Sequence, residues 1–413
     1  MSDADGEPSL ETAREAGARA VREAVWIDDV AGMRALLAQL EGVEELALDV
    51  EANGMFVYRA RLCLMQLGYV ARGTPGVAII DTLSVDPAPL AELLGPRGPR
   101  KILHDLAFDA RLLAEYQIPL GRVSDTSVLA RFVGLEATGL ASVAGSVLGV
   151  ELTKGLQQHD WSERPVTPRQ RDYLASDVAY LLPLFHALRA RAQALDVLEE
   201  ADEETAYRLR SALEPAASTR PSWSRLKGSA ELGPVARAVL RRGYALRERL
   251  AAEIDRPSHR VVSNDRLLEL ARRRPTSPAE LARVLGGGAE LGAWLEAVRS
   301  GIADGDVPEQ ERAALEPRLL PAESVARRRR AEGLVSSWRA REAERRGIDP
   351  QAVLPGHCAS ALASLLHEPP PPEQRRERMA AIDGVGARRI ERHAEAWLAL
   401  FDVLDASPAP KGA

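Results

Sequence analysis

The sequence of 413 residues predicts a mixed α/β domain followed by two small all-α domains. Two observations carry this prediction: three strand-like apolar runs lie within the first 83 residues, and the chain after residue 222 is helical in its periodicity. The length supports the division, because single domains usually hold roughly 100 to 200 residues.

The strand-like runs are ELALDVE (45–51), RLCLMQLGYV (61–70) and GVAIIDTL (76–83), separated by turns that contain Gly. This spacing predicts a meander of antiparallel strands. From residue 101 the pattern changes to a short strand (101–104) and then to helices. The first 213 residues are therefore expected to form one mixed α/β domain.

Segments rich in Pro, Gly and small polar residues mark the expected boundaries. The two helical domains share an aromatic residue, an Arg/Glu-rich helix, a Pro-marked turn and a Val-led helix, which predicts a diverged tandem repeat. EPPPPE predicts a stiff loop in the second copy. The predicted parts are an N-terminal extension, the α/β domain, a linker, a helical domain, a linker, a second helical domain and a disordered tail: 1–24, 25–213, 214–222, 223–300, 301–322, 323–405 and 406–413.

Charge is distributed unevenly along the chain. Residues 1–219 carry 21 basic and 33 acidic side chains, residues 220–299 carry 16 and 9, and residues 300–413 carry 17 and 18. An acidic first half beside a basic middle favours a metal-binding unit next to a module that meets phosphate. Solvated helix faces also produce charge runs of this kind.

No stretch approaches the roughly 18 consecutive apolar residues of a membrane span, and the first residues lack an apolar signal core. A soluble, cytoplasmic protein without a membrane partner is expected. Cys63 and Cys358 have no CxxC or Cys/His partners, so we expect buried apolar side chains rather than a disulfide framework or a zinc site.

Two carboxylates interrupt the first apolar strand. Side chains alternate along a strand, so Asp49 and Glu51 share one face while Leu48 and Val50 share the other. Two like charges about 7 Å apart on such a strand are unfavourable unless a cation lies between them or the face is wet. The alternative is a solvent-facing strand edge.

A third carboxylate follows the short strand. If a helix begins with Asp105 as its N-cap, Asp109 lies on the same side as the apolar Leu113. A carboxylate on an apolar helix face needs a partner that compensates its charge. His104, at the end of the strand, could approach such a site or could be a structural histidine.

The fourth carboxylate lies on a helix with a tyrosine. Tyr173 and Asp177 are four residues apart and so share a helical face, and Pro183 is expected to end or kink this helix. A core hydrogen-bonded pair is the alternative. Together, four carboxylates in this order can surround two divalent cations about 3.5 to 4 Å apart. Mg²⁺ or Mn²⁺ suits oxygen ligands, and such a site activates water for phosphodiester hydrolysis.

Residues from about 25 to 210 resemble the DEDD exonuclease domain of the ribonuclease D family. The resemblance rests on DVE (49–51), HDLAFD (104–109) and DWSERPVTPRQRDYLASDVAYLLPL (160–184). It implies a ribonuclease H-like mixed sheet and 3′-5′ exonuclease activity. Val50 stands where members often have Thr, but its side chain points away from the expected metals. Asp172 occupies the position of the His of the sister branch, so the tyrosine marks the DEDDy branch.

The resemblance also implies roles for these side chains. Asp49, Glu51 and Asp177 would hold the metal that binds the nucleophilic water. Asp49 would bridge to a second metal, which Asp109 supports through water. Tyr173 would orient the attacking water.

Candidate substrate contacts are less closely tied to the motifs. Lys154 and the segment 157–161, which ends in Trp161, are expected to touch substrate phosphate, and His104 and Arg164 are further candidates.

Residues 225–286 resemble a helicase-and-RNase-D C-terminal (HRDC) domain, a small helical module that binds nucleic acid, and the last unit resembles a second, diverged copy. Within it, IDGVGARRIERHAEAW (382–397) is similar to a helix-hairpin-helix turn, whose backbone amides can meet phosphate oxygens. A plain helix-packing turn is the alternative.

These features predict a hydrolytic 3′-5′ exoribonuclease that uses two divalent metal ions, Mg²⁺ or Mn²⁺. Its expected substrate is RNA with a single-stranded 3′ end, such as a tRNA precursor, gripped by the helical domains. No obligate protein partner is expected. The alternatives are a 3′-5′ exonuclease that acts on DNA and a non-catalytic scaffold that binds nucleic acid.

Overall fold

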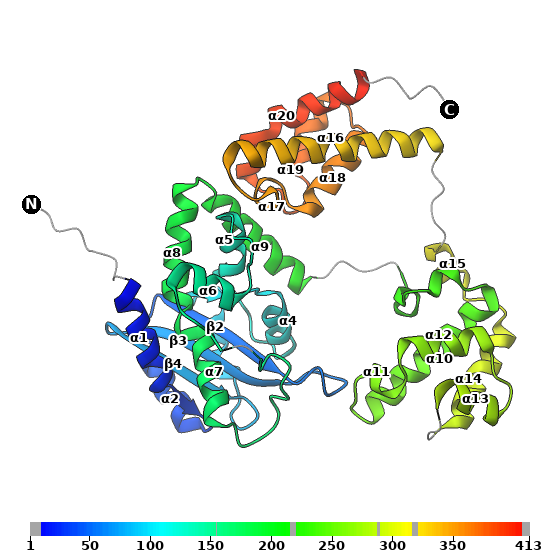
Figure 1. The fold of residues 1–413 in the computed structure, drawn as a ribbon, viewed down its shortest axis with the longest axis horizontal. Helices are drawn as coiled ribbons and strands as arrows, with labels where there is room; N and C mark the ends of the chain where they lie inside the picture. Colours follow the sequence, from blue (N-terminus) through cyan, green and yellow to red (C-terminus); the bar gives the residue numbers. More distant parts are fainter. Residues whose placement is uncertain (1–9, 154, 215–219, 287–289, 316–320, 407–413) are drawn as a thin grey trace, which may run out of the picture. The chain divides into compact units, whose positions relative to one another are not determined.

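The computed structural model describes residues 10–153, 155–214, 220–286, 290–315 and 321–406 (Figure 1). The chain divides into two compact units. Unit 1 combines residues 1–51, 62–215 and 320–413, and unit 2 combines residues 52–61 and 216–319.

Unit 1 is built on a six-stranded mixed sheet with the strand order β1-β4-β3-β2-β5-β6. β3 and β4 are antiparallel, whereas β1 runs parallel to β4, and β5 runs parallel to both β2 and β6. The three strands of the expected meander are neighbours, and the expected short strand is present as β5. The strands are β1 (Val25–Ile27), β2 (Glu45–Ala52), β3 (Leu62–Ala71), β4 (Thr74–Asp81), β5 (Arg100–Leu103) and β6 (Val123–Asp125).

Helices of the first 214 residues pack around this sheet (Figure 1). Their shared core includes strand residues such as Leu64 and Ile79 and helix residues such as Phe132 and Phe185. The helices are α1 (Leu10–Arg22), α2 (Val30–Gln39), the 3-10 helix η1 (Ala88–Leu90), α3 (Ala91–Leu94), α4 (Ala107–Glu115), α5 (Thr126–Phe132), α6 (Leu140–Leu148), α7 (Pro168–Ala179), α8 (Leu181–Ala194) and α9 (Leu198–Leu213).

The position of α7 is set by its N-terminal cap and by its close packing on the sheet. Thr167 and Gln170 form a capping box, and Pro168 occupies the first turn, where its missing N–H is no loss. α7 packs on β3 and β4. A Cβ at Gly68 of β3 would lie 2.6 Å from the carbonyl oxygen of Val178, so this close approach requires glycine.

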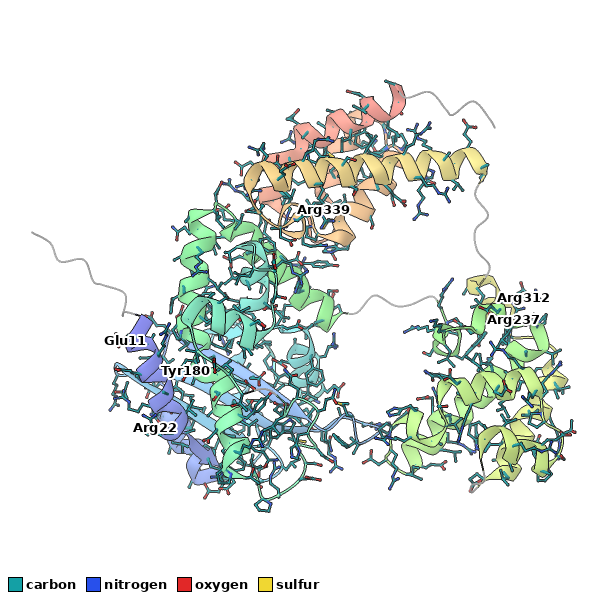
Figure 2. The ribbon with its side chains drawn as sticks, viewed as in Figure 1. Glu11, Arg22, Tyr180, Arg237, Arg312 and Arg339 are labelled. Carbon is teal, nitrogen blue, oxygen red and sulfur yellow. The ribbon has the colours of Figure 1, made fainter. Side chains whose placement is uncertain are left out.

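The N-terminal extension contributes α1, which packs against α7 and β4 (Figure 1). A Cβ at Gly17 would lie 2.3 Å from the ring of Tyr180, and Figure 2 shows Tyr180 beside this helix. α7 ends at Ala179, ahead of Pro183, as expected. Residues 1–9 of the extension lie outside the described part of the chain.

Unit 2 is helical and has its own core around Trp223, Leu267 and Trp294. Asp306 lies between two arginines, 3.0 Å from Arg237 and 4.0 Å from Arg312 (Figure 2). Its elements are the 3-10 helices η2 (Ser222–Arg225) and η3 (Ser229–Glu231) and the helices α10 (Pro234–Glu253), α11 (Ser258–Val261), α12 (Asn264–Arg273), α13 (Pro278–Leu285), α14 (Leu291–Asp304) and α15 (Glu309–Leu315).

The last helices of unit 1 repeat the helix order of α10 to α14: a long helix, a single turn, then three further helices. This order supports the predicted tandem repeat. Arg339 of α16 donates to the carbonyl of Pro350 at 2.7 Å (Figure 2). The elements are α16 (Ala322–Arg346), α17 (Pro350–Val353), α18 (Gly356–His367), η4 (Pro372–Gln374), α19 (Arg375–Ala380) and α20 (Ala387–Ala406).

The predicted division into three successive domains differs from the two units observed. α17 packs on α5 and α20 packs on α9, and the C-terminal helices share the core of the α/β domain. Charge explains part of this fusion: Arg392 of α20 lies 2.7 Å from Asp196 and 3.0 Å from Glu200, and Glu200 is buried. The predicted boundaries remain predictions, and the linker core (215–219) and the tail (407–413) lie outside the described residues.

The helix-hairpin-helix-like turn serves this packing. The backbone N–H of Arg388 donates to Glu203 Oε1 at 3.0 Å, so a carboxylate of α9 already occupies the position that a phosphate would take. Gly384 and Gly386 have φ of +80° and +77°, and a Cβ on either would collide with side chains of α9. These contacts favour the helix-packing alternative.

Two smaller expectations can be compared directly with the fold. Cys63 and Cys358 are both buried, as predicted. No helix in the described ranges combines the length and the apolar character that crossing a membrane would require.

Candidate active site

Three carboxylates from two elements converge at the centre of unit 1. Asp49 and Glu51 lie on β2, and Asp177 lies on α7. One oxygen from each lies within 4.8 Å of the others, a spacing that suits ligands of one cation. The alternation expected for β2 is observed, since Leu48 and Val50 are buried. A solvent-facing edge is excluded for this strand, because β2 lies between β3 and β5.

Asp109, the fourth predicted carboxylate, lies on α4, is 5 % exposed and is not part of this three-ligand group. The charges of Asp49 and Asp109 act on one another across the site, which places them as electrostatic neighbours. The predicted helix start was wrong: α4 begins at Ala107, and Asp105 is not its N-cap but has a left-handed φ of +66°.

Asp125 performs the capping that was expected of Asp105. Its carboxylate, which is fully buried, accepts the backbone N–H groups of Asp105 at 3.0 Å and Leu106 at 3.1 Å, and that of Ser127 at 2.8 Å. It thereby ties the start of α4, and so Asp109, to the end of β6. Asp125 was not among the residues predicted from the sequence. The available signal was its position between an apolar run and a helix, where Asp is a favoured N-cap.

Tyr173 is 6 % exposed, and its hydroxyl donates a hydrogen bond to the Asp177 carboxyl. Burial raises the pKa of Tyr173, and the negative charges of Asp177, Glu51 and Asp49 raise it further. The hydroxyl therefore keeps its proton and can act as a hydrogen-bond donor or orienting group beside the carboxylates.

The carboxylates hold their protons unusually tightly. Burial raises the pKa of Asp49 to about 7 and, with repulsion from Asp49, that of Asp177 to about 8. Burial and the charges of Asp49, Asp177 and Asp109 raise the pKa of Glu51 to about 10. Burial, followed by the charge of Asp49, raises the pKa of Asp109 well above its usual value.

These shifts provide a test of whether a divalent cation fits. A cluster of desolvated carboxylates that repel one another is stabilised when a cation neutralises it. Oxygen donors at this spacing are those that Mg²⁺ and Mn²⁺ prefer. Asp49, Glu51 and Asp177 therefore fit the expected metal, and Asp109 fits a supporting position beside Asp49.

The candidate substrate contacts lie in different environments. Lys154 lies outside the described residues. His104 Nδ1 lies 2.8 Å from Thr126 Oγ1, a contact that favours the structural interpretation. Trp161 is 1 % exposed and packs behind Tyr173, and Arg164 is engaged in internal hydrogen bonds. The burial of Trp161 and the internal hydrogen bonds of Arg164 do not favour either side chain as a direct phosphate contact.

Comparisons with known proteins agree with the geometry. The family model described as 3′-5′ exonuclease matches residues 24–193, and that described as HRDC domain matches residues 236–291. Ribonuclease D of Acidiphilium cryptum is 31 % identical over 309 residues, which cover 70 % of this chain and 76 % of that protein. Ribonuclease D of Granulibacter bethesdensis is 31 % identical over 298 residues, or 67 % and 71 % of the two chains.

Solved structures show the same relationship. Escherichia coli RNase D, described as an exoribonuclease involved in structured RNA processing, superposes with a TM-score of 0.68 at 26 % identity, over 92 % of this chain and 98 % of that one. A protein from Bifidobacterium adolescentis has the same fold, with a TM-score of 0.74 at 22 % identity over 92 % and 97 %. The chain, with its 3′-5′ exonuclease domain and its HRDC domain, therefore belongs to the ribonuclease D family.

Proposed function

We propose that this member of the family is a hydrolytic 3′-5′ exoribonuclease that uses two divalent cations, Mg²⁺ or Mn²⁺, and trims the 3′ ends of structured RNA such as tRNA precursors. The convergence of Asp49, Glu51 and Asp177 around one position, with Tyr173 bonded to Asp177, carries this proposal. The RNA substrate is supported by the ribonuclease D relatives and by the structured-RNA role given for the Escherichia coli protein.

Each side chain of the site would have its own role in the reaction. Asp49, Glu51 and Asp177 would hold one cation, and Asp49 with Asp109 would hold the second. Bound there, the cations would lower the pKa of a water and neutralise the charge that develops on the phosphodiester. The Tyr173 hydroxyl, fixed by Asp177, would orient the attacking water. Because the site is partly buried, an extended 3′ end is the form of RNA that would reach it.

The direct test uses 5′-labelled single-stranded RNA with Mg²⁺ or Mn²⁺. We expect stepwise shortening from the 3′ end, inhibition by EDTA, and loss of activity in Asp49→Asn with RNA affinity within about twofold of the wild type. Asp172→Asn is the matched control, because Asp172 is exposed on α7 and outside the cluster. Undiminished cleavage by Asp49→Asn would contradict the assignment.

Two further substrates decide the alternatives. A DNA oligonucleotide of the same sequence should be degraded more slowly, and equal or faster degradation would favour the DNA exonuclease. A tRNA precursor with a 3′ trailer should be shortened to the mature end, and trimming that runs on into the acceptor stem would oppose a role in tRNA maturation. Binding without cleavage of any substrate would indicate the scaffold.

A further inference from the structure

Arg164 lies at the centre of a hydrogen-bond group that joins three segments of unit 1. Its Nε donates to Asp81 Oδ2 at 2.7 Å, and its Nη2 donates to Asp81 Oδ1 at 2.6 Å and to the carbonyl of Cys63 at 3.2 Å. Its Nη1 donates to the carbonyls of Trp161 and Glu163, both at 2.8 Å. The segment 161–164 is thereby tied to the end of β4 and the start of β3.

This pattern uses the whole hydrogen-bonding capacity of the guanidinium. Arginine has five N–H donors, and Arg164 makes five such bonds. The acceptor carboxylate is deeply placed, since the side chain of Asp81 is 4 % exposed and that of Arg164 is 27 % exposed. An arginine so engaged has no donor in reserve for a substrate phosphate, so the expected substrate contact at Arg164 is not favoured.

The segment held by Arg164 supports the catalytic tyrosine. The ring of Trp161 stacks on that of Tyr173 with centroids 5.8 Å apart and planes at 21°. The rings of His159 and Trp161 form a T-shaped pair with centroids 5.1 Å apart. His159 Nε2 in turn lies 2.6 Å from the side-chain amide of Gln170, in the first turn of α7. Trp161 is therefore packed between groups that fix its ring plane.

A continuous path leads from the ion pair to the metal site. Arg164 fixes the carbonyl of Trp161, the Trp161 ring lies against Tyr173, and the Tyr173 hydroxyl donates to Asp177. Each step is a direct contact between the described side chains or backbone atoms. A shift of the Trp161 backbone would be passed to the tyrosine ring, because interiors are close-packed and have little free volume to absorb it.

We propose that Arg164, paired with Asp81, is a positioning residue that sets the orientation of the Tyr173 hydroxyl through the ring of Trp161. The proposal rests on the proposed role of Tyr173 in the reaction. Loss of the ion pair should slow the chemical step and leave RNA binding intact, whereas loss of a direct phosphate contact would weaken RNA binding.

The test compares Arg164→Lys and Asp81→Asn, each alone and combined with Tyr173→Phe, by single-turnover cleavage of RNA at saturating enzyme with Mg²⁺. Each single variant should lower the cleavage rate about tenfold or more, yet no further than Tyr173→Phe itself. RNA affinity should remain within about twofold of the wild type. In the Tyr173→Phe background the additional loss should disappear, because the group through which Arg164 acts is already gone.

Two variants guard against simple misfolding. Trp161→Phe keeps an aromatic ring in place and should show the same rate loss, dependent on Tyr173 in the same way. Arg169→Lys makes the same substitution at an exposed position of α7 and should leave the rate unchanged. Thermal unfolding of every variant, followed by circular dichroism, reports any general loss of structure.

Three outcomes would overturn the proposal. Weaker RNA binding with an unchanged cleavage rate would make Arg164 a phosphate contact. Rate losses that multiply fully in the Tyr173→Phe background would show that the ion pair does not act through the tyrosine. Wild-type activity in Tyr173→Phe would remove the role on which the proposal rests, whereas failure of the proposed function itself would appear separately, as an inactive wild-type protein.

Discussion

Replacing Asp177 by Asn should abolish cleavage and, at the same time, stabilise the metal-free protein. Asn keeps the shape of the side chain and removes one negative charge from a partly buried cluster. In the proposed mechanism that charge helps to hold a cation, whereas in the metal-free protein the same charge opposes folding. Active sites commonly carry such a conflict between activity and stability.

The size of the gain follows from the geometry. Two unit charges 4.8 Å apart, the limit of the spacing between the ligand oxygens of Asp49 and Asp177, repel by about 3.5 kcal/mol at an effective dielectric constant of about 20. At roughly 2 °C per kcal/mol for a large domain, the melting temperature of the metal-free variant should rise by about 7 °C.

The gain should depend on pH in a defined direction. The folded-state pKa of Asp177 is raised to about 8, whereas a free Asp carboxyl titrates near 3.9. Between these values the unfolded state binds fewer protons than the folded state, so the metal-free wild type loses stability as pH rises from about 4 to 8. Asn has no such dependence. The variant's advantage should therefore be small near pH 4 and complete near pH 8.5.

Thermal unfolding in EDTA at pH 5 and pH 8.5, followed by repetition with Mg²⁺, measures both effects. Mg²⁺ should raise the melting temperature of the wild type by preferential binding to the folded state, and this response should be lost in the variant. Asp172→Asn, on the exposed side of α7, should change neither value. If Asp177→Asn proved no more stable than the wild type in EDTA at pH 8.5, the inference of repelling carboxylates would be refuted.

Further predictions concern the support of the site and the C-terminal helices. Asp125→Asn should lose about 1 to 3 kcal/mol of stability and lower the cleavage rate, measured by unfolding and kinetics, because the backbone N–H groups just before α4 lose a charged acceptor. Gly386→Ala should lower the melting temperature, since its φ is +77° and a Cβ would lie 2.0 Å from Glu203. Truncation at residue 320, which keeps unit 2, should yield a fragment that aggregates by light scattering, because it uncovers the surfaces of α5 and α9. A stable, monomeric fragment would count against the shared core.

The carboxylate cluster could be predicted from sequence because its geometry is local in each element. Alternation along β2 places Asp49 and Glu51 on one face, and a spacing of four residues places Tyr173 beside Asp177 on α7. Neither pattern shows that the two faces meet. That information came from the order of the motifs and from the resemblance they carry, and the structure agrees with it.

The features that the sequence could not predict depend on partners far along the chain. Asp125 caps a helix start 19 residues before it, and Arg164 pairs with Asp81 across 83 positions. Local pattern therefore favoured Asp105 as the cap, and nothing near Arg164 in the sequence indicated that its donors are used inside the fold. In both cases the partner that decides the role of the side chain lies far away in the sequence and is brought close only by the fold.

A count of charges along the sequence also leaves out the ion pairs that form inside the fold. Part of the acidity of residues 1–219 is neutralised inside unit 1, where Arg392 meets Asp196 and Glu200. The carboxylate of Glu203 likewise accepts a hydrogen bond from the backbone N–H of Arg388 in the helix-hairpin-helix-like turn. The acidic excess of residues 1–219 therefore overstates the electrostatic repulsion of an RNA substrate. The C-terminal helices contribute to the fold of unit 1.

The basic excess of residues 220–299 then remains the best candidate for the RNA-binding surface, and substitutions within unit 2 of the full-length protein can test it. Arg272 and Arg274 are exposed at the end of α12, whereas Arg242 is held by Asp304 at 2.7 Å. Replacing Arg272 and Arg274 together by Gln should weaken RNA binding and reduce the slope of log affinity against log salt by about 1.4, at roughly 0.7 for each phosphate contact on a single strand. Arg242→Gln should have a smaller effect, because its charge is already paired.

Cleavage at saturating enzyme should stay at the wild-type rate in both variants. A slope unchanged by the double substitution would mean that this end of α12 does not contact the RNA backbone, and that the basic excess is a solvated helix face.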